Sequence, residues 1–124
     1  MNLAKVAQMT VRGSGVLLIV LGILFWTGRA EALQIVHILL GLLLVVALWT
    51  LAFLAGRAGV NLGLVALAVV LGLVMPVLGL TQKDLLSGDG HWVIQVVHLL
   101  VGLAAIGLAE RLGAAIKTRA AAPV

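Results

Sequence analysis

The chain has 124 residues, of which 64% are hydrophobic and 10% are charged, and its formal net charge is +4. Soluble globular domains contain about 25% charged residues, so this composition excludes a soluble enzyme or soluble binding domain and indicates an integral membrane protein. The absence of cysteine excludes disulfides, cysteine-ligated zinc and iron–sulfur clusters. The basic residues lie at the ends of apolar segments and not in an aromatic-rich patch, so the expected partner is the lipid bilayer and no nucleic acid is expected.

Four apolar segments follow one another along the chain and predict an all-α transmembrane four-helix bundle. We expect a single domain, residues 1–124, with helices over residues of about 6–27, 33–55, 60–80 and 91–112. Pro76 should kink or break the last turns of the third helix, because proline supplies no N–H to the helix ladder. The tail from Lys117 to Val124 is rich in alanine and basic residues and is expected to be frayed or disordered.

Lysine and arginine are unevenly distributed between the two sides of the expected bundle. One side carries Arg29 and Lys83, and the side of both termini carries Lys5, Arg12, Arg57, Arg111, Lys117 and Arg119. The positive-inside rule therefore predicts a multi-pass protein of the cell (cytoplasmic) membrane with both termini in the cytoplasm. The first segment, followed by Ala30-Glu31-Ala32, also imitates a secretory signal with a cleavage site. We interpret it as the first helix.

Two stretches of the chain share one polar pattern. Residues 34–41 and 95–102 both read Gln-x-x-His-x-x-x-Gly within long apolar runs, at an offset of 61 residues. The helices before them match at an offset of 50 residues, where Gly22 corresponds to Gly72. We interpret the chain as two tandem helical-hairpin repeats related by a pseudo-two-fold axis along the membrane normal, and they cover residues of about 13–55 and 63–112.

The repeated histidines, His37 and His98, lie on the second and fourth expected helices. Those helices run parallel, so both imidazoles are expected at a similar depth near the outer surface and facing the bundle axis. Ionisable residues buried in a membrane are costly and usually functional. Two inward imidazoles on facing helices are what bis-histidine ligation of haem iron requires. We therefore predict that they bind haem b, either as one haem shared by both or as two haems with one histidine each.

Other residues on these helix faces are expected to line the haem slot. Gly41 and Gly102, one turn beyond each histidine, remove side-chain bulk where a macrocycle edge would press on the backbone. Gln34 and Gln95, one turn outward, are placed to hydrogen-bond a propionate, a water molecule or an imidazole N–H. The matching glycines of the first and third helices, Gly22 and Gly72, are expected to open space in the same way.

Two further residues have alternative interpretations. His91 shares the helix face of His98 but has no counterpart in the first repeat, and it is interpreted as an interfacial residue or, alternatively, as a haem ligand or propionate contact. Met75, beside Pro76, is expected to fill the core, with axial ligation as the alternative. A zinc or copper site is disfavoured, because the three histidines have no inward carboxylate beside them.

The histidines on the second and fourth helices, with Gln34 three positions before His37, resemble one four-helix half of the heme A synthase family, or a small membrane b-type cytochrome. The resemblance extends over all four spans. It implies a four-helix bundle in which the histidine pair holds a b-type haem. The catalytic half of that family has a glutamate where Gln34 stands, and its outer-loop cysteine pair has no counterpart here. The resemblance therefore favours haem binding over haem hydroxylation, since glutamine cannot do acid–base chemistry.

The predicted function is one-electron transfer or haem carriage within the membrane. One alternative is a cofactor-free scaffold or accessory subunit, in which the glutamine and histidine side chains only hold helices together. A second alternative is a heme A synthase-like enzyme. A redox partner protein or a quinone is an expected partner of the first function, and a homodimer is left open.

Overall fold

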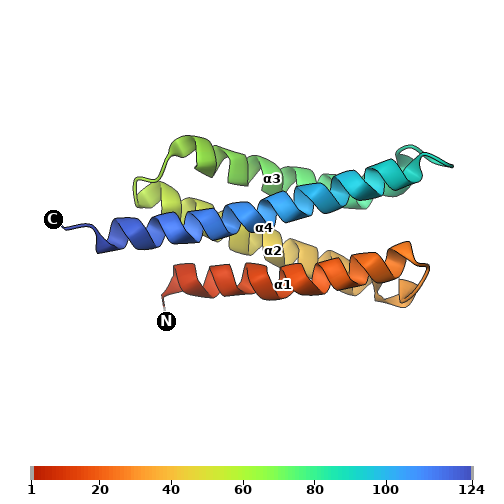
Figure 1. The fold of residues 1–124 in the computed structure, drawn as a ribbon, viewed down its shortest axis with the longest axis horizontal. Coiled ribbons are helices and arrows are strands. Elements are labelled where there is room, and N and C mark those ends of the chain that lie inside the picture. The colour runs from red at the N-terminus through yellow and green to blue at the C-terminus, as the bar shows by residue number, and fades with distance from the viewer. Residues whose placement is uncertain (1, 124) are drawn as a thin grey trace.

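The computed structural model describes residues 2–123 and contains four long helices and two short 3-10 turns (Figure 1). In chain order they are α1 (Leu3–Trp26), η1 (Glu31–Leu33), α2 (Gln34–Arg57), α3 (Leu62–Thr81), η2 (Gln82–Asp84) and α4 (His91–Ala121). No strand occurs in residues 2–123. All four helices are long and apolar enough to cross a membrane, so the prediction of an all-α protein with four membrane-length helices is confirmed. The tandem repeat stays a prediction.

The four helices alternate in direction and form a bundle (Figure 1). Each packs against the next along the chain, α1 packs against α4, and α2 and α4 also contact each other. Both termini lie at one end of the bundle together with the α2–α3 connection, and we call this the termini end. The connections over residues 27–33 and 82–90 lie at the opposite end, which we call the histidine end. The first turns of α2 and α4 both lie at the histidine end, because the two helices run in the same direction.

Asparagine side chains cap the N-termini of two of the helices. Asn2 Oδ1 accepts the backbone N–H of Lys5 at the start of α1, over 2.9 Å, and Asn61 Oδ1 accepts that of Gly63 at the start of α3, over 2.7 Å. Asparagine is favoured there because its side chain satisfies a helix N–H that has no backbone partner. The turn after α2 is tight because Gly59 has a φ of +72°, in the left-handed region that glycine adopts without strain.

The helices differ from expectation at the end of α4, and of the two outcomes expected at Pro76, a kink or a break, the break does not occur. α4 continues to Ala121, so the prediction of a frayed or disordered segment from Lys117 is wrong up to that residue, and Val124 lies outside the described residues. Alanine, lysine and arginine are strong helix formers, which explains the extension. At 1.5 Å per residue the 31 residues of α4 reach about 46 Å, which exceeds the roughly 30 Å hydrocarbon core of a bilayer. α3 is not broken at Pro76 and runs on to Thr81.

The packed core occupies the half of the bundle toward the termini end. The buried residues of α2 extend from Leu44 to Ala55, and those of α4 begin at Ala105. Many of them are alanine, which allows helices to approach closely in a membrane. Toward the histidine end, α2 has no buried residue before Leu44 and α4 has none before Ala105. The two halves of the bundle therefore differ in packing.

Large apolar side chains cover the outside of all four helices. Leu17 of α1, Phe53 of α2, Val70 of α3 and Leu100 of α4 each expose more than half of their surface. Soluble monomers rarely expose continuous apolar surface of this kind. Lipid chains are the environment that such a surface fits.

Trp49 of α2 packs against the backbone of α3 at Gly72. Its Nε1 donates to the carbonyl oxygen of Val69 over 3.4 Å. A Cβ atom at Gly72 would overlap the indole ring, so glycine is the residue that permits this contact. The contact joins α2 to α3 within the packed half.

Replacement of Gly72 by alanine is expected to lower the free energy of unfolding by about 1–3 kcal/mol, because the added methyl group displaces the Trp49 indole. Gly13→Ala is the matched control, since a Cβ atom at Gly13 would meet nothing within 4 Å, and it should be neutral or slightly stabilising. Unfolding of both variants in the same detergent tests this. Equal stability of the two variants would disprove the close contact.

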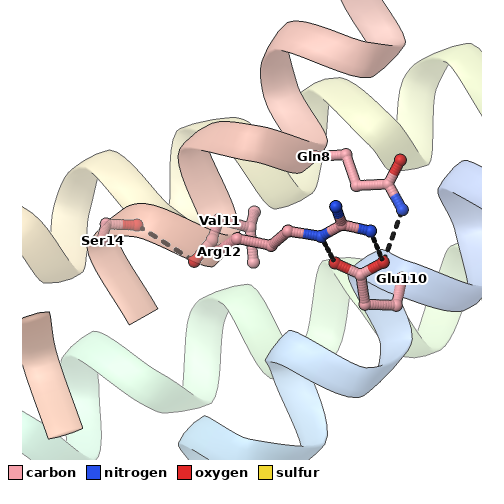
Figure 2. A network of polar contacts seen from close by, with 5 residues as sticks. All are labelled: Gln8, Val11, Arg12, Ser14 and Glu110. Carbon is pink, nitrogen blue, oxygen red and sulfur yellow. Dashed lines mark hydrogen bonds and ion pairs between the residues drawn. The ribbon is translucent and has the colours of Figure 1, made fainter. Parts of the chain in front are cut away.

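A polar network joins α1 to α4 toward the termini end (Figure 2). Arg12 donates from Nε and Nη2 to the two carboxylate oxygens of Glu110, over 2.6 and 2.7 Å. Gln8 Nε2 also donates to Glu110 Oε2, over 2.6 Å. Paired donors from one guanidinium to one carboxylate are strongly directional. The network therefore fixes the position of α1 along α4.

Replacement of Glu110 by alanine is expected to lower the thermal unfolding midpoint, because Arg12 and Gln8 lose their shared acceptor. An Arg12→Glu, Glu110→Arg double variant should recover most of the loss, since it restores the pair with its charges exchanged. The midpoints are compared for purified protein in one detergent. A double variant no more stable than Arg12→Glu alone would show that the pair does not join the helices.

Candidate functional site

A cavity of about 390 Å³ lies between the helices toward the histidine end, where the packed core stops. All four helices line it, including Gly22 of α1, His37 of α2, Gly79 of α3 and His98 of α4. Protein interiors are normally close-packed, with few voids larger than a water molecule. The histidine half of the bundle is therefore hollow, whereas leucine and alanine fill the other half.

His37 and His98 are neighbours in this cavity. Their ring centroids are 6.3 Å apart and the ring planes make an angle of 44°. A metal ion bonds an imidazole nitrogen at about 2 Å, and the ring centroid lies about 1 Å behind that nitrogen, so two rings sharing one ion from opposite sides have centroids roughly 6 Å apart. The observed separation agrees with that distance. Phe25 of α1 packs edge-on to His37, with centroids 5.4 Å apart.

Neither imidazole has a hydrogen-bond partner for Nδ1 within the described part of the chain. In both His37 and His98 this atom is buried, and no acceptor or donor among residues 2–123 reaches it. Buried polar atoms are normally paired, and an unpaired one costs about 1–3 kcal/mol. The two histidines therefore do not hold α2 and α4 together through their Nδ1 atoms.

A glycine lies beside each imidazole. A Cβ atom at Gly22 would be 3.9 Å from Cε1 of His37, and a Cβ atom at Gly79 would be 3.1 Å from Cε1 of His98. Larger residues at either position would restrict the ring. On both α1 and α3, therefore, a glycine forms the part of the cavity wall next to a histidine.

The glycine of α3 that lies beside a histidine ring is not the one that the sequence repeat suggested. Gly72 corresponds to Gly22 in the sequence repeat but contacts Trp49 and does not line the cavity, so the prediction that it opens space at the histidines is wrong. Gly79 takes this place. It follows Gly72 by seven residues, which is two helical turns, so both lie on the same face of α3.

The predicted glycines of α2 and α4 do line the cavity. A Cβ atom at Gly41 or Gly102 would meet nothing within 4 Å. The backbone is therefore open to the cavity at both positions. Met75 also lines it and is almost fully buried, at 7% exposure.

Polar side chains gather at the outer part of the cavity. Gln34 and Gln95 line it as expected from the sequence, and Lys83 and Gln82 of η2 line it as well. Lys83 Nζ donates to Gln34 Oε1 over 3.2 Å, and Gln82 Nε2 donates to the carbonyl oxygen of Gly79 over 3.3 Å. Sequence reasoning missed the two η2 residues, because helical periodicity does not orient a connection.

His91 lies apart from the cavity. It is the first residue of α4, and its Nδ1 is 3.2 Å from the carbonyl oxygen of Leu85 in the preceding connection. This contact closes the turn that leads into α4. The structure thus leaves His91 outside the cavity. The other six predicted site residues all line it: Gln34, His37, Gly41, Gln95, His98 and Gly102.

The donor set of the cavity is small. Within residues 2–123 no group of three or more histidine, cysteine, aspartate or glutamate side chains is placed to hold a metal ion. Among the lining residues that the structure describes, none is a carboxylate and Lys83 is the only charged one. The protein offers two imidazoles, a cation and carboxamides in otherwise apolar walls.

Comparison of the chain with protein-family models, with curated proteins and with solved structures finds no match. The resemblance to the heme A synthase family therefore stays a prediction. A functional interpretation rests on the geometry and chemistry of the cavity.

Proposed function

We propose that this chain is a membrane haem-binding protein in which His37 and His98 ligate one b-type haem, and that it transfers single electrons or carries haem within the bilayer. The observation that carries this proposal is the pair of imidazoles 6.3 Å apart in a cavity that side chains do not fill. A bound haem supplies one-electron chemistry at its iron. The chain supplies two nitrogen ligands and largely apolar walls.

Haem suits this donor set better than a bare metal ion does. Structural zinc is held by four ligands from the protein, and catalytic zinc by three. The cavity offers only two imidazoles and no carboxylate. A porphyrin brings four nitrogens of its own, so that two histidines complete the coordination of its iron. Two imidazoles without a further protein ligand also disfavour a copper site.

The spacing of the rings favours one haem over two. A centroid separation of 6.3 Å leaves room for one ion between the imidazoles. Two haems, each on one histidine, would need the rings to point away from each other. We therefore assign both histidines to one iron.

The cavity fits the two alternative functions less well. In a cofactor-free scaffold the histidines would bridge helices, yet the Nδ1 atoms of His37 and His98 are unpaired. Contacts elsewhere in the bundle join the helices, such as the Arg12–Glu110 pair. A heme A synthase-like enzyme would need an acid or base in the cavity, and no carboxylate of the described part of the chain lines it.

The proposed location within the membrane follows from the charge distribution. We place the termini end in the cytoplasm, because six of the eight basic residues lie on that side. The histidines then lie near the outer surface. One haem near one face does not span the roughly 30 Å apolar layer. Electron transfer across the membrane would therefore use a redox partner protein, a quinone or a second copy of the chain.

The absorption spectrum of the protein, purified from haem-replete cells, tests the proposal. We expect a Soret band and sharp α and β bands on reduction, as a haem iron with two imidazole ligands gives. A colourless preparation from such cells would contradict haem binding. Hydroxylated or formylated haem in a solvent extract would instead favour the enzyme.

A further inference from the structure

Of the residues 2–123 that the structure describes, Lys83 is the only charged one that lines the cavity. It lies in η2 at the histidine end, and its Nζ donates to Gln34 Oε1 over 3.2 Å. The one ion pair within residues 2–123 joins Arg12 to Glu110. No carboxylate of the described chain therefore lies within ion-pair distance of the Lys83 ammonium.

The surroundings of Lys83 suit an anion. Three carboxamides line the same cavity, those of Gln34, Gln82 and Gln95, and each can donate N–H groups. Hydrogen bonds from a charged donor to a carboxylate are shorter and stronger than those between neutral groups. The outer part of the cavity therefore offers a cation and neutral donors, and no carboxylate is among its described lining residues.

The hydrogen bond to Gln34 links Lys83 to the face of α2 that carries His37. Gln34 and His37 are three residues apart on α2, which places them on one face and about 4.5 Å apart along the helix axis. A molecule bound at the imidazoles thus has its outward edge near Lys83. Haem has a matching form, because both of its carboxylates lie on one edge of an apolar macrocycle.

We propose that Lys83, positioned by its hydrogen bond to Gln34, binds a carboxylate of the molecule in the cavity. This assignment rests on the haem function proposed above, in which the carboxylates are the haem propionates. It adds an orientation, with the propionate edge toward the histidine end. It also adds a specificity, since Lys83 selects porphyrins with free carboxylates over esterified ones.

Titration of the full chain, freed of haem and held in lipid nanodiscs, tests this assignment with haem b and with its dimethyl ester. We expect the wild-type chain to bind haem b about 10-fold more tightly than the ester, as one charge-assisted hydrogen bond would give. Lys83→Met should remove that preference and leave the spectrum of histidine ligation intact. Lys83→Arg should keep it. Arg29→Met is the matched control, because Arg29 lies at the same end and does not line the cavity.

Three results would overturn the assignment. The first is equal affinity of the wild-type chain for the acid and the ester, with histidine ligation in both, which leaves the haem function standing. The second is a loss of preference in Arg29→Met as large as in Lys83→Met, which would indicate a general surface-charge effect. The third is the absence of a histidine-ligated spectrum with either porphyrin, which would overturn the haem function as well.

Discussion

Alanine at either His37 or His98 is expected to abolish the spectrum of six-coordinate haem. Loss of an outer-shell partner of a metal ligand already lowers metal affinity roughly 10–100-fold, so loss of a ligand itself should cost more. Each single variant should retain little haem, or haem with one open coordination position. Absorption spectra and haem content of the purified variants, at equal protein concentration, provide the measurement.

His91→Ala is the matched control for these variants. His91 bonds the carbonyl oxygen of Leu85 and does not line the cavity, so its loss should leave the haem spectrum unchanged. A protein that keeps six-coordinate haem without His98 but loses it without His91 would show that the wrong histidine has been assigned. Normal yield and helix content of all three variants would exclude misfolding as the cause.

Leucine at Gly102 is expected to stabilise the haem-free protein and to block haem binding. A Cβ atom there would meet nothing within 4 Å, and the position lines the cavity, so the larger side chain would occupy the space proposed for haem. Removing a glycine from a helix interior raises the free energy of unfolding by about 1 kcal/mol. Contacts in the filled cavity should add to this. Unfolding in detergent and haem titration measure the two effects, which have opposite signs.

Gly107→Leu separates helix propensity from cavity filling. Gly107 lies five residues further along α4, is exposed, and does not line the cavity. This variant should gain the helix propensity of leucine and keep the haem affinity of the wild type. If Gly102→Leu bound haem as well as Gly107→Leu does, the cavity would not be the haem site.

Much of the site follows from local sequence pattern. Two matched Gln-x-x-His-x-x-x-Gly stretches on apolar segments are enough to place His37, His98 and their neighbours on the faces of two parallel helices. The structure adds that these helices touch and that the two imidazoles are neighbours. Helical periodicity alone cannot supply that distance, because it depends on how α2 and α4 pack.

The features that sequence reasoning missed depend on packing between distant segments. The repeat aligned Gly22 with Gly72, yet the glycine that lies beside His98 is Gly79. Lys83 lies in a connection, where no periodicity orients a side chain. From the sequence, Glu110 is the sole acidic residue on the side of the bundle that carries both termini. Its pairing with Arg12 still required the fold.

Electron paramagnetic resonance of the ferric protein, combined with iron determination per chain, tests most directly whether His37 and His98 share one haem. We expect one iron per chain and the low-spin signal of a haem with two imidazole ligands, lost when either histidine becomes alanine. A high-spin signal in the wild-type protein, two irons per chain, or no iron at all would contradict the shared site.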